Sequence, residues 1–418
     1  MSLSGAISAA VTALSAQSSA LSLVSNNLAN ASTTAYKTTS ASFASLLSGG
    51  SAVSGVASGG VAISGVSNVT EQGLLTSSSV STNVAIYGNG FFVTNDAAEG
   101  GAAYYTRNGE FSVDADGYLV NNGYFLQGWP TDADGTVVGG TTASNLESID
   151  VDSISTIASP TTETSFVANL PADATVGGTF TSSIEVFDSL GTAANVTVTW
   201  TKTADNSWTA SFSNPVSNGA TIGTTSAGAI AIAFNDDGTL ASTSPSPATL
   251  AISGWTTGAA ASSIALDFGT AGTATGLSQY ATGDETLTVD LESTQDGTAM
   301  GSLISISIDE DGNVNANYDN DTERAIFKIP VATFTNSDGL TSLSYGMYAA
   351  STESGSSTLR LSGQNGAGTV YGSQIELSTT DTSTEFANMM AAQQAYSGAA
   401  QVMSAANSMF ETLISAVR

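Results

Sequence analysis

The chain has 418 residues, enough for two or three domains, and a formal net charge of −29 from 36 acidic and 7 basic residues. Such a surface repels nucleic acid and anionic membranes, so we expect neither as a partner. The sequence contains no cysteine and no histidine, which excludes disulfides, thiolate metal sites, cysteine nucleophiles and histidine acid–base chemistry.

The first 28 residues carry an apolar pattern with alternating three- and four-residue spacing, which is the seam of a coiled coil. Residues 1–35 contain no lysine and no glutamate, although both are usual on the outside of a solvated coiled coil. A helix this poor in charge is expected to have more than one neighbour. The predicted seam residues are Leu3, Ile7, Leu14, Leu21, Val24 and Leu28.

The N-terminal region lacks the features of a targeting segment. No basic stretch precedes its apolar positions, and their spacing is that of an amphipathic helix rather than of a secretory signal peptide. No run approaches about eighteen consecutive apolar residues, so no membrane span is predicted. If the protein leaves the cell, we expect a route without a cleaved signal peptide.

Irregular structure is expected after the first helix, which is predicted to end near Asn30. Asn, Ser and Thr follow, and their side chains compete with helical hydrogen bonds. Residues 48–70 are rich in serine and glycine. Residues 31–70 are therefore predicted to form an extended linker, or an arm that orders against a neighbour.

From about Val84 to about Trp129 the pattern is that of short antiparallel strands. Asn108-Gly109 carries a hairpin signal, and Asp116-Gly117 and Asn122-Gly123 follow at short intervals. We expect a β meander in this stretch.

Residues 146–285 alternate apolar and polar positions in several short runs, which is typical of a β-sandwich or barrel. Strand-like runs resume at Leu303 and continue to Phe334. The predicted fold is mainly β with a terminal α-helical coiled coil, and its β domains are nested between the N- and C-terminal helices. The predicted domains are 1–30 with 382–418 (coiled coil), 31–70 (linker or arm), 71–145 with 286–370 (middle β domain) and 146–285 (inserted outer β domain).

The last 37 residues predict a second long helix. Thr382 and Glu385 have capping-box spacing, and the apolar pattern again alternates three and four residues. We expect the two terminal helices to pair and then to pack among copies of the chain; a coil within one chain is the alternative. The predicted seam residues are Phe386, Met389, Tyr396, Met403, Phe410, Ile414 and Val417.

Four Asp-Gly segments resemble fragments of calcium loops. The position that needs a glutamate, counted from Asp114, is Phe125, so the pattern fails. Because each segment lies between strand-like runs, a hairpin turn is favoured. Serine is abundant but has no histidine partner, and the scattered carboxylates give no reason to choose a pair. No catalytic site, metal or cofactor is predicted, and we do not expect an enzyme.

Several segments carry a family resemblance. Asn26-Asn27-Leu28-Ala29-Asn30, followed by Tyr36-Lys37, resembles the N-terminal signature of the rod and hook axial proteins of the bacterial flagellum. The segments 88–93, 105–111, 116–119 and 386–396 are similar to further shared blocks of that family. The segments 186–191 and 330–340, with the inserted β domain, resemble the hook members most closely. Ala35 stands where the signature usually has glycine, so an ordinary φ and a turn of different shape are expected there.

This resemblance implies a structural subunit that assembles into a curved, flexible tube. Its terminal helices would line an export channel, and the tube would act as a universal joint that transmits torque. The implied partners are copies of itself, rod, hook-cap and hook–filament junction proteins and the flagellar type III export apparatus; the implied location is the extracellular flagellum. The alternatives are a distal rod subunit, which should lack a large inserted domain, and a secreted β-rich adhesin or enzyme, which would need a binding face or a site.

Overall fold

The computed structural model describes residues 3–47, 58–132, 134–226, 228–283 and 286–417. The chain forms two compact units. The first contains residues 1–153, 305–316 and 324–418, and the second contains residues 154–304 and 317–323. The protein is mainly β with one long helix near each end, as predicted.

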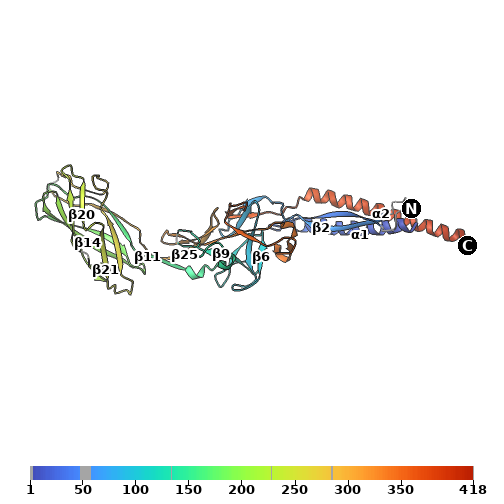
Figure 1. The fold of residues 1–418 in the computed structure, drawn as a ribbon, viewed down its shortest axis with the longest axis horizontal. Coiled ribbons are helices and arrows are strands. Elements are labelled where there is room, and N and C mark those ends of the chain that lie inside the picture. The colour runs from blue at the N-terminus through green and yellow to red at the C-terminus, as the bar shows by residue number, and fades with distance from the viewer. Residues whose placement is uncertain (1–2, 48–57, 133, 227, 284–285, 418) are drawn as a thin grey trace. The chain divides into compact units, whose positions relative to one another are not determined.

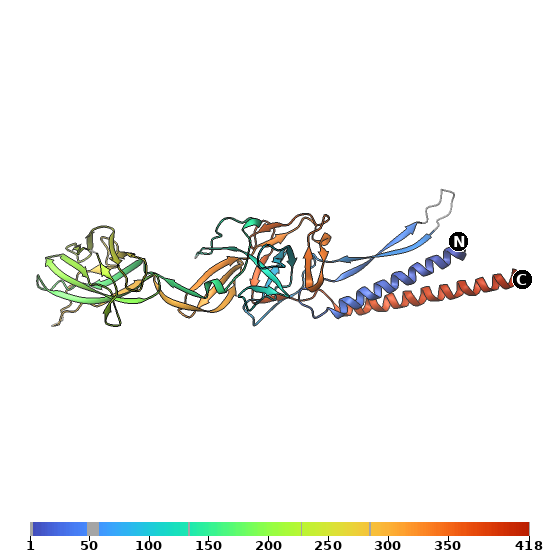
Figure 2. The same cartoon turned by 90° about the horizontal axis from the view of Figure 1, so that it is seen from below.

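The two long helices belong to the first unit and lie side by side (Figures 1 and 2). Helix α1 spans Leu3–Ala29 and helix α2 spans Thr382–Val417, with 27 and 36 residues respectively. The amide Nδ2 of Asn30 donates to the carbonyl of Asn26 (2.9 Å), and α1 ends there, as the sequence predicts. By length and apolar composition alone, Gly5–Ala29 would suffice to cross a membrane; here this serine-rich helix packs against α2 and a hairpin.

That hairpin occupies much of the stretch expected to be a linker or arm. Strands β1 (Thr39–Leu47) and β2 (Ser58–Ser67) pair antiparallel and lie along α1 (Figure 2). The hydroxyl oxygen of Thr12 on α1 accepts from the amide of Val61 (3.4 Å). The glycine-rich segment 48–57, part of the same expectation, lies outside the described residues.

The β part of the first unit is built from short strands that come from both halves of the chain. Strand β5 pairs with β6, β9 and β28, so residues near 92 lie beside residues near 331. The boundary between the two units falls within β25, β26 and β27. The strands are β3 (Leu75–Ser77), β4 (Val84–Tyr87), β5 (Phe91–Asn95), β6 (Ala103–Thr106), β7 (Ser112–Val113), β8 (Leu119–Asn121), β9 (Tyr124–Pro130), β10 (Glu147–Ser148), β25 (Thr298–Ile308), β26 (Asn313–Tyr318), β27 (Glu323–Lys328), β28 (Val331–Thr333), β29 (Thr341–Ser342), β30 (Met347–Ala349), β31 (Thr358–Arg360), β32 (Thr369–Gly372) and β33 (Gln374–Glu376), with 3₁₀ turns at Ala143–Asn145, Asp152–Ile154, Ser337–Gly339 and Ser344–Gly346.

Two of the three predicted turns in this region are hairpin turns. Asn122 and Gly123, with φ of 50° and 83°, join β8 to β9, and Asp116-Gly117 lies between β7 and β8. The prediction for Asn108-Gly109 is wrong, because β6 pairs with β5 and β30 rather than with β7. Glycine serves a different purpose there, since a Cβ at Gly109 would lie 1.6 Å from the carbonyl oxygen of Val84. Close approach of two backbones requires the glycine.

The second unit is a β-sandwich, one of the two architectures predicted. Buried side chains of both sheets share one core, in which the rings of Phe166 and Trp200 lie 6.3 Å apart. The predicted alternation is confirmed in β14, where Val196, Val198 and Trp200 are fully buried. One sheet contains β12 (Glu163–Asn169), β18 (Thr224–Thr225), β21 (Ala248–Ser253), β22 (Ser262–Asp267), β23 (Leu277–Ser278) and β24 (Leu291–Gln295); the other contains β13 (Thr179–Phe187), β14 (Ala193–Ala204), β15 (Ser207–Phe212), β16 (Val216–Ser217), β17 (Ala220–Thr221), β19 (Ile230–Phe234) and β20 (Leu240–Ser244), while β11 (Thr156–Ser159) pairs with β25.

The acidic residues of the Asp-Gly segments support the turn interpretation. One carboxylate oxygen of Asp132 accepts from the amides of Asp134 (3.1 Å) and Thr136 (2.8 Å). One oxygen of Asp114 accepts from Asp116 and Tyr118 in the same way. These carboxylates close their own turns. Across the described ranges, no group of three or more acidic side chains is placed to hold a metal ion.

Candidate assembly site on the terminal helices

Small residues are among the buried positions of both terminal helices, which pack against each other. Ala16 and Ala20 on α1, and Ala392 and Ala406 on α2, are buried. Short side chains let two helices approach closely. The sequence prediction chose the larger apolar residues and missed these alanines, although Ala392, Ala399 and Ala406 recur every seven residues.

The predicted seam residues divide into two groups. Val24 is buried, and Ile7, Leu14, Leu21, Leu28, Met389 and Met403 are half-buried. Phe386, Tyr396, Phe410 and Ile414 are exposed. The side chains of Leu3 and Val417 lie outside the described residues. One chain therefore covers part of the predicted seam and leaves several large apolar side chains in solvent.

The side chain of Asn27 on α1 bonds both to α2 and to the segment that leads into β1. Its amide Nδ2 donates to a carboxylate oxygen of Glu385 (3.1 Å) and to the carbonyl of Thr39 (3.0 Å). Its Oδ1 accepts from the amide of Thr39 (3.0 Å) and from the hydroxyl of Tyr36 (3.1 Å). Glu385 is on α2, so this one buried side chain links both helices to the start of β1. Burial, with a contribution from Glu385, raises the pKa of Tyr36.

The other signature residues shape the end of α1. Asn26 and Ala29 are exposed, Leu28 and Asn30 are half-buried, and Asn30 accepts from the hydroxyl of Thr33 (3.1 Å). They therefore close the helix rather than line the site.

The start of α2 differs from the predicted capping box. The carboxylate of Asp381 accepts from the amides of Ser383 (2.8 Å) and Thr384 (3.1 Å), so Asp381 is the cap and the prediction for Thr382 is wrong. Glu385 does not reach back to the helix start. It points inward because Asn27 offers it a buried donor.

Lys37, Glu376 and Arg107 form a buried ion cluster beneath the helix junction. The Lys37 ammonium lies 2.6 Å from one oxygen of Glu376, and the Arg107 guanidinium lies 3.6 Å from the other. Lys37 also donates to the carbonyl of Glu71, and Glu376 accepts from the amide of Gly73 (2.7 Å). All three charged side chains are nearly inaccessible to solvent. Burial lowers the pKa of Lys37, and the nearby Glu376 carboxylate opposes that shift.

This cluster joins segments that are far apart in the sequence. Lys37 precedes β1, Arg107 follows β6, and Glu376 ends β33. Removal of one member of a buried ion pair leaves an uncompensated charge, which typically costs about 3–5 kcal/mol. The cluster therefore anchors both terminal helices to the β part of the first unit.

The expectation of an ordinary φ at Ala35 is wrong. Its φ is 56°, in the left-handed region, so the turn keeps the shape that a glycine would give. Its amide donates to the carbonyl of Glu376 (2.8 Å), which holds the turn against β33. An alanine in this conformation costs about 1–2 kcal/mol.

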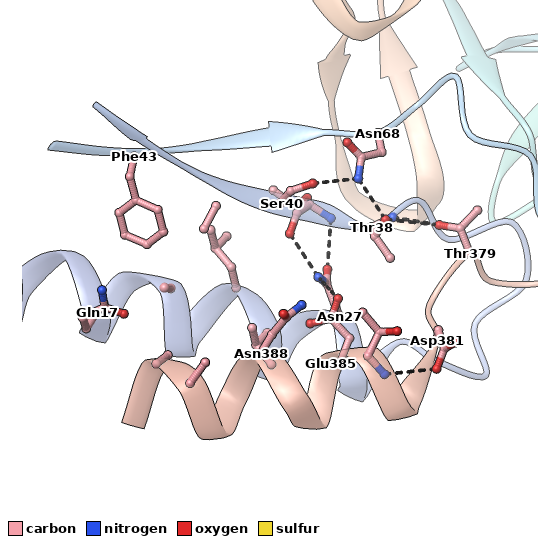
Figure 3. Close-up of a pocket in the computed structure, with 18 of the residues that line it drawn as sticks. Gln17, Asn27, Thr38, Ser40, Phe43, Asn68, Thr379, Asp381, Glu385 and Asn388 are labelled. Carbon is pink, nitrogen blue, oxygen red and sulfur yellow. Dashed lines mark hydrogen bonds between the residues drawn. The ribbon is translucent and has the colours of Figure 1, made fainter. Parts of the chain in front are cut away.

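A trough lies between α1, β1 and α2 (Figure 3). Its volume is about 670 Å³. Small and apolar side chains form the floor and one end, and polar side chains gather at the start of α2. We use the name trough for the space lined by Ala20, Val24, Asn27, Phe43, Glu385 and Ala391, together with their neighbours Glu71, Asp381 and Ala395.

The site is suited to docking rather than to chemistry. It combines an open trough with apolar side chains exposed along α2, and Asn27 uses its amide to bond Glu385 and the backbone. An apolar groove beside a helix is a surface on which partner helices dock in other proteins.

Four family models match the chain, and each describes a flagellar axial protein. They are the flagella basal body rod protein (residues 7–37), the flagellar hook protein FlgE/F/G D1 domain (85–167), the flagellar basal body protein FlaE D2 domain (145–298) and the flagellar basal body rod FlgEFG protein C-terminal region (373–416). The fold and these matches define a flagellar axial protein with paired terminal helices.

The curated relatives narrow this class. Flagellar hook protein FlgE of Brucella abortus is 30% identical over 100% of both chains, and that of Rhizobium meliloti is 32% identical over 100% of both. Flagellar hook protein FlgE of Escherichia coli is 31% identical over 98% of this chain and 99% of that one. A crystal structure of Helicobacter pylori flagellar hook protein FlgE2 matches with a TM-score of 0.48 and 12% identity, over 71% of this chain and 99% of that chain.

The chain belongs to the flagellar hook protein family and is a structural subunit of the bacterial flagellar hook. The rod-subunit alternative is not favoured, because relatives matched over the full length are hook proteins.

Proposed function

We propose that copies of this chain polymerise through their terminal helices into a flexible, curved tube. Residues 1–30 with 382–418 form its inner layer and line an export channel. The β part of the first unit forms the wall, and the second unit, residues 154–304 and 317–323, lies outermost. Such a tube transmits torque as a universal joint while its outer contacts change at each rotation.

The observation that carries this proposal is the bare end of α2. Ala406 is the last buried residue of this helix, and the turns that follow have no cover from α1 among the described residues. Met409, Phe410, Leu413 and Ile414 are about half exposed or more. Burial of a side chain of this size contributes about 1.5–3 kcal/mol. Because the chain belongs to a family of structural subunits, we propose that a second copy covers these side chains.

The distribution of charge favours the same arrangement. Residues 1–36 carry no charged side chain, so the formal charge of −29 belongs almost wholly to the β domains. Neutral helices can pack closely, whereas acidic outer domains repel one another unless salt screens them. The inner layer would therefore hold the tube together, and the outer domains would make weak contacts that slide.

Membership of the family supports a proposal for the other partners. We propose that the subunit crosses the envelope uncleaved through the flagellar type III export apparatus and joins rod, hook-cap and hook–filament junction proteins.

Electron microscopy of the full chain after salt-induced polymerisation tests the proposal. Leu413→Glu should abolish tubes, because it places a charge on the bare end of α2, while the circular dichroism of the monomer stays unchanged. Val176→Glu is the matched control, since Val176 is an equally exposed apolar residue in the sandwich, and it should form tubes. Tubes of normal length from Leu413→Glu would contradict the proposal.

A further inference from the structure

The exposed face of α1 carries an unbroken row of small side chains. We call it the serine row; its members are Ser8, Val11, Ser15, Ser18, Ser22 and Ser25, all of them exposed. They alternate four- and three-residue spacing, which is a second coiled-coil seam on a helix that already has one. A helix face meant only for solvent usually carries charged residues.

The serine row lies opposite the trough. Ala20 and Val24 form the floor of the trough, and Ser18 and Ser22 each lie two positions before one of them. Two positions on an α-helix correspond to about 200° of rotation. One subunit therefore presents the row on one side of α1 and the trough on the other.

The trough contains an acceptor without a donor. Glu385 is only 8% exposed, and Asn27 donates to one of its carboxylate oxygens. The other oxygen, Oε2, is buried and has no hydrogen-bond partner in the part of the chain that the structure describes. A buried acceptor left without a donor is costly, so an occupant that brings one would be favoured.

We propose that the trough binds the serine row of a second copy of this chain, a contact that rests on the proposed assembly and specifies it. The hydroxyls of the row supply donors for Glu385. Small side chains on both surfaces, such as Ala391 and Ser18, allow the helices to approach closely.

The negative charge of the trough favours the serine row over the bare end of α2 as its occupant. The trough is lined by three carboxylates, those of Glu71, Asp381 and Glu385. The end of α2 carries Glu411, which would add a fourth, whereas α1 has no charged residue. Like charges in contact oppose docking.

The arrangement also accounts for an open polymer. A two-fold dimer uses the same patch on both copies, but here two different patches meet, and each copy offers both. Heterologous contacts of this kind repeat from copy to copy and generate rings or helical filaments.

Cross-linking tests the contact directly, because the chain has no cysteine of its own. Ser18→Cys is combined with Ala391→Cys or with Ala395→Cys in the full chain, and polymers and monomers are oxidised in parallel. The polymer should give a ladder of covalent multimers, and the monomer should not. Each single-cysteine variant is the control, since it can link two copies at most.

A charge variant provides a second readout that does not depend on cysteine. Ser18→Glu brings a carboxylate to the trough and should raise the critical concentration for polymerisation at least about tenfold at low salt, less at high salt. Ser397→Glu is the matched control, because Ser397 is an exposed serine of α2 that lies two positions, about 200° of rotation, after the trough residue Ala395, and its effect should be small. Circular dichroism of both monomers should match the unmodified chain.

The outcomes separate this contact from the proposed function. If the unmodified chain forms no tubes, the proposed assembly fails. If it forms tubes but neither cysteine pair gives a ladder, the docking of row and trough is wrong and the assembly stands. If the cysteine variants do not polymerise, the comparison of Ser18→Glu with Ser397→Glu decides, and equal effects overturn the contact.

Discussion

The sandwich and the terminal helices use apolar residues in opposite ways. The sandwich buries its large side chains, including Trp200 and Trp208, in one continuous core. The helices bury alanines and leave Phe386, Met409 and Leu413 in solvent. The sandwich has a closed core within one chain, whereas the helices leave an apolar surface that we propose is covered in a polymer. Stability and assembly should therefore respond to different substitutions.

The largest effect is expected where the helices join the β part of the first unit. Glu376→Ala would leave the Lys37 and Arg107 charges buried without a carboxylate partner, and should lower the free energy of unfolding of the first unit by about 3–5 kcal/mol. Hydrogen exchange, resolved by segment, should show loss of protection there and none in the sandwich. Glu353→Ala, at an exposed carboxylate, is the control. Equal protection in the two variants would mean that the cluster anchors nothing.

The next pair of variants compares the two regions with one chemical change. Leu250→Ala removes a fully buried side chain of the sandwich and should cost about 2–5 kcal/mol of unfolding free energy. Leu413→Ala, at an exposed site, should change that free energy by less than about 0.5 kcal/mol but raise the critical concentration for polymerisation. Denaturant unfolding and sedimentation of polymers measure the two quantities. A loss of monomer stability in Leu413→Ala would remove the distinction.

A smaller effect concerns alkaline pH. Burial raises the pKa of Tyr348 to about 12, from an ordinary value of 10.0. The folded state holds the proton more tightly, so this group stabilises the fold below pH 10 and loses that contribution as the pH rises toward 12. Two pKa units correspond to about 3 kcal/mol at most.

Tyr348→Phe isolates that contribution. Unfolding by denaturant at pH 9 and pH 12 should show a larger loss of stability for the unmodified chain than for Tyr348→Phe. Other titrating groups, Lys37 and Tyr36 among them, are present in both proteins and cancel in the comparison. Identical losses would show that Tyr348 ionises with an ordinary pKa.

The sequence predicts those elements in which apolar residues recur at a fixed spacing. The two-residue alternation in β14 reflects which face of the strand is buried. The seven-residue repeats of α1 and α2 locate both helices, but on α2 several of the repeated side chains, such as Phe386 and Phe410, are exposed. The family resemblance likewise rested on local segments such as 26–30.

The rest depends on residues that meet only after folding. Lys37 and Glu376 are 339 positions apart, and no local pattern relates them. Glu385 had the right spacing for a capping box, but Asn27 offered it a better partner from another helix. Asn108-Gly109 had the composition of a hairpin turn, but Val84 requires the glycine for close packing. Each of these errors has the same cause, since a tertiary contact overrode a local preference.

The smallest expected effect tests strain at Ala35. Because its φ is 56°, Ala35→Gly should relieve about 1–2 kcal/mol of backbone strain. The added freedom of the unfolded chain should cost about 0.4–1 kcal/mol, which leaves a net stabilisation of about 1 kcal/mol or less. Ala41→Gly in β1, where no positive φ is found, is the control and should destabilise the first unit. Thermal unfolding of the monomer measures both, and a loss of stability in Ala35→Gly would mean that the packing of its buried methyl group outweighs the strain.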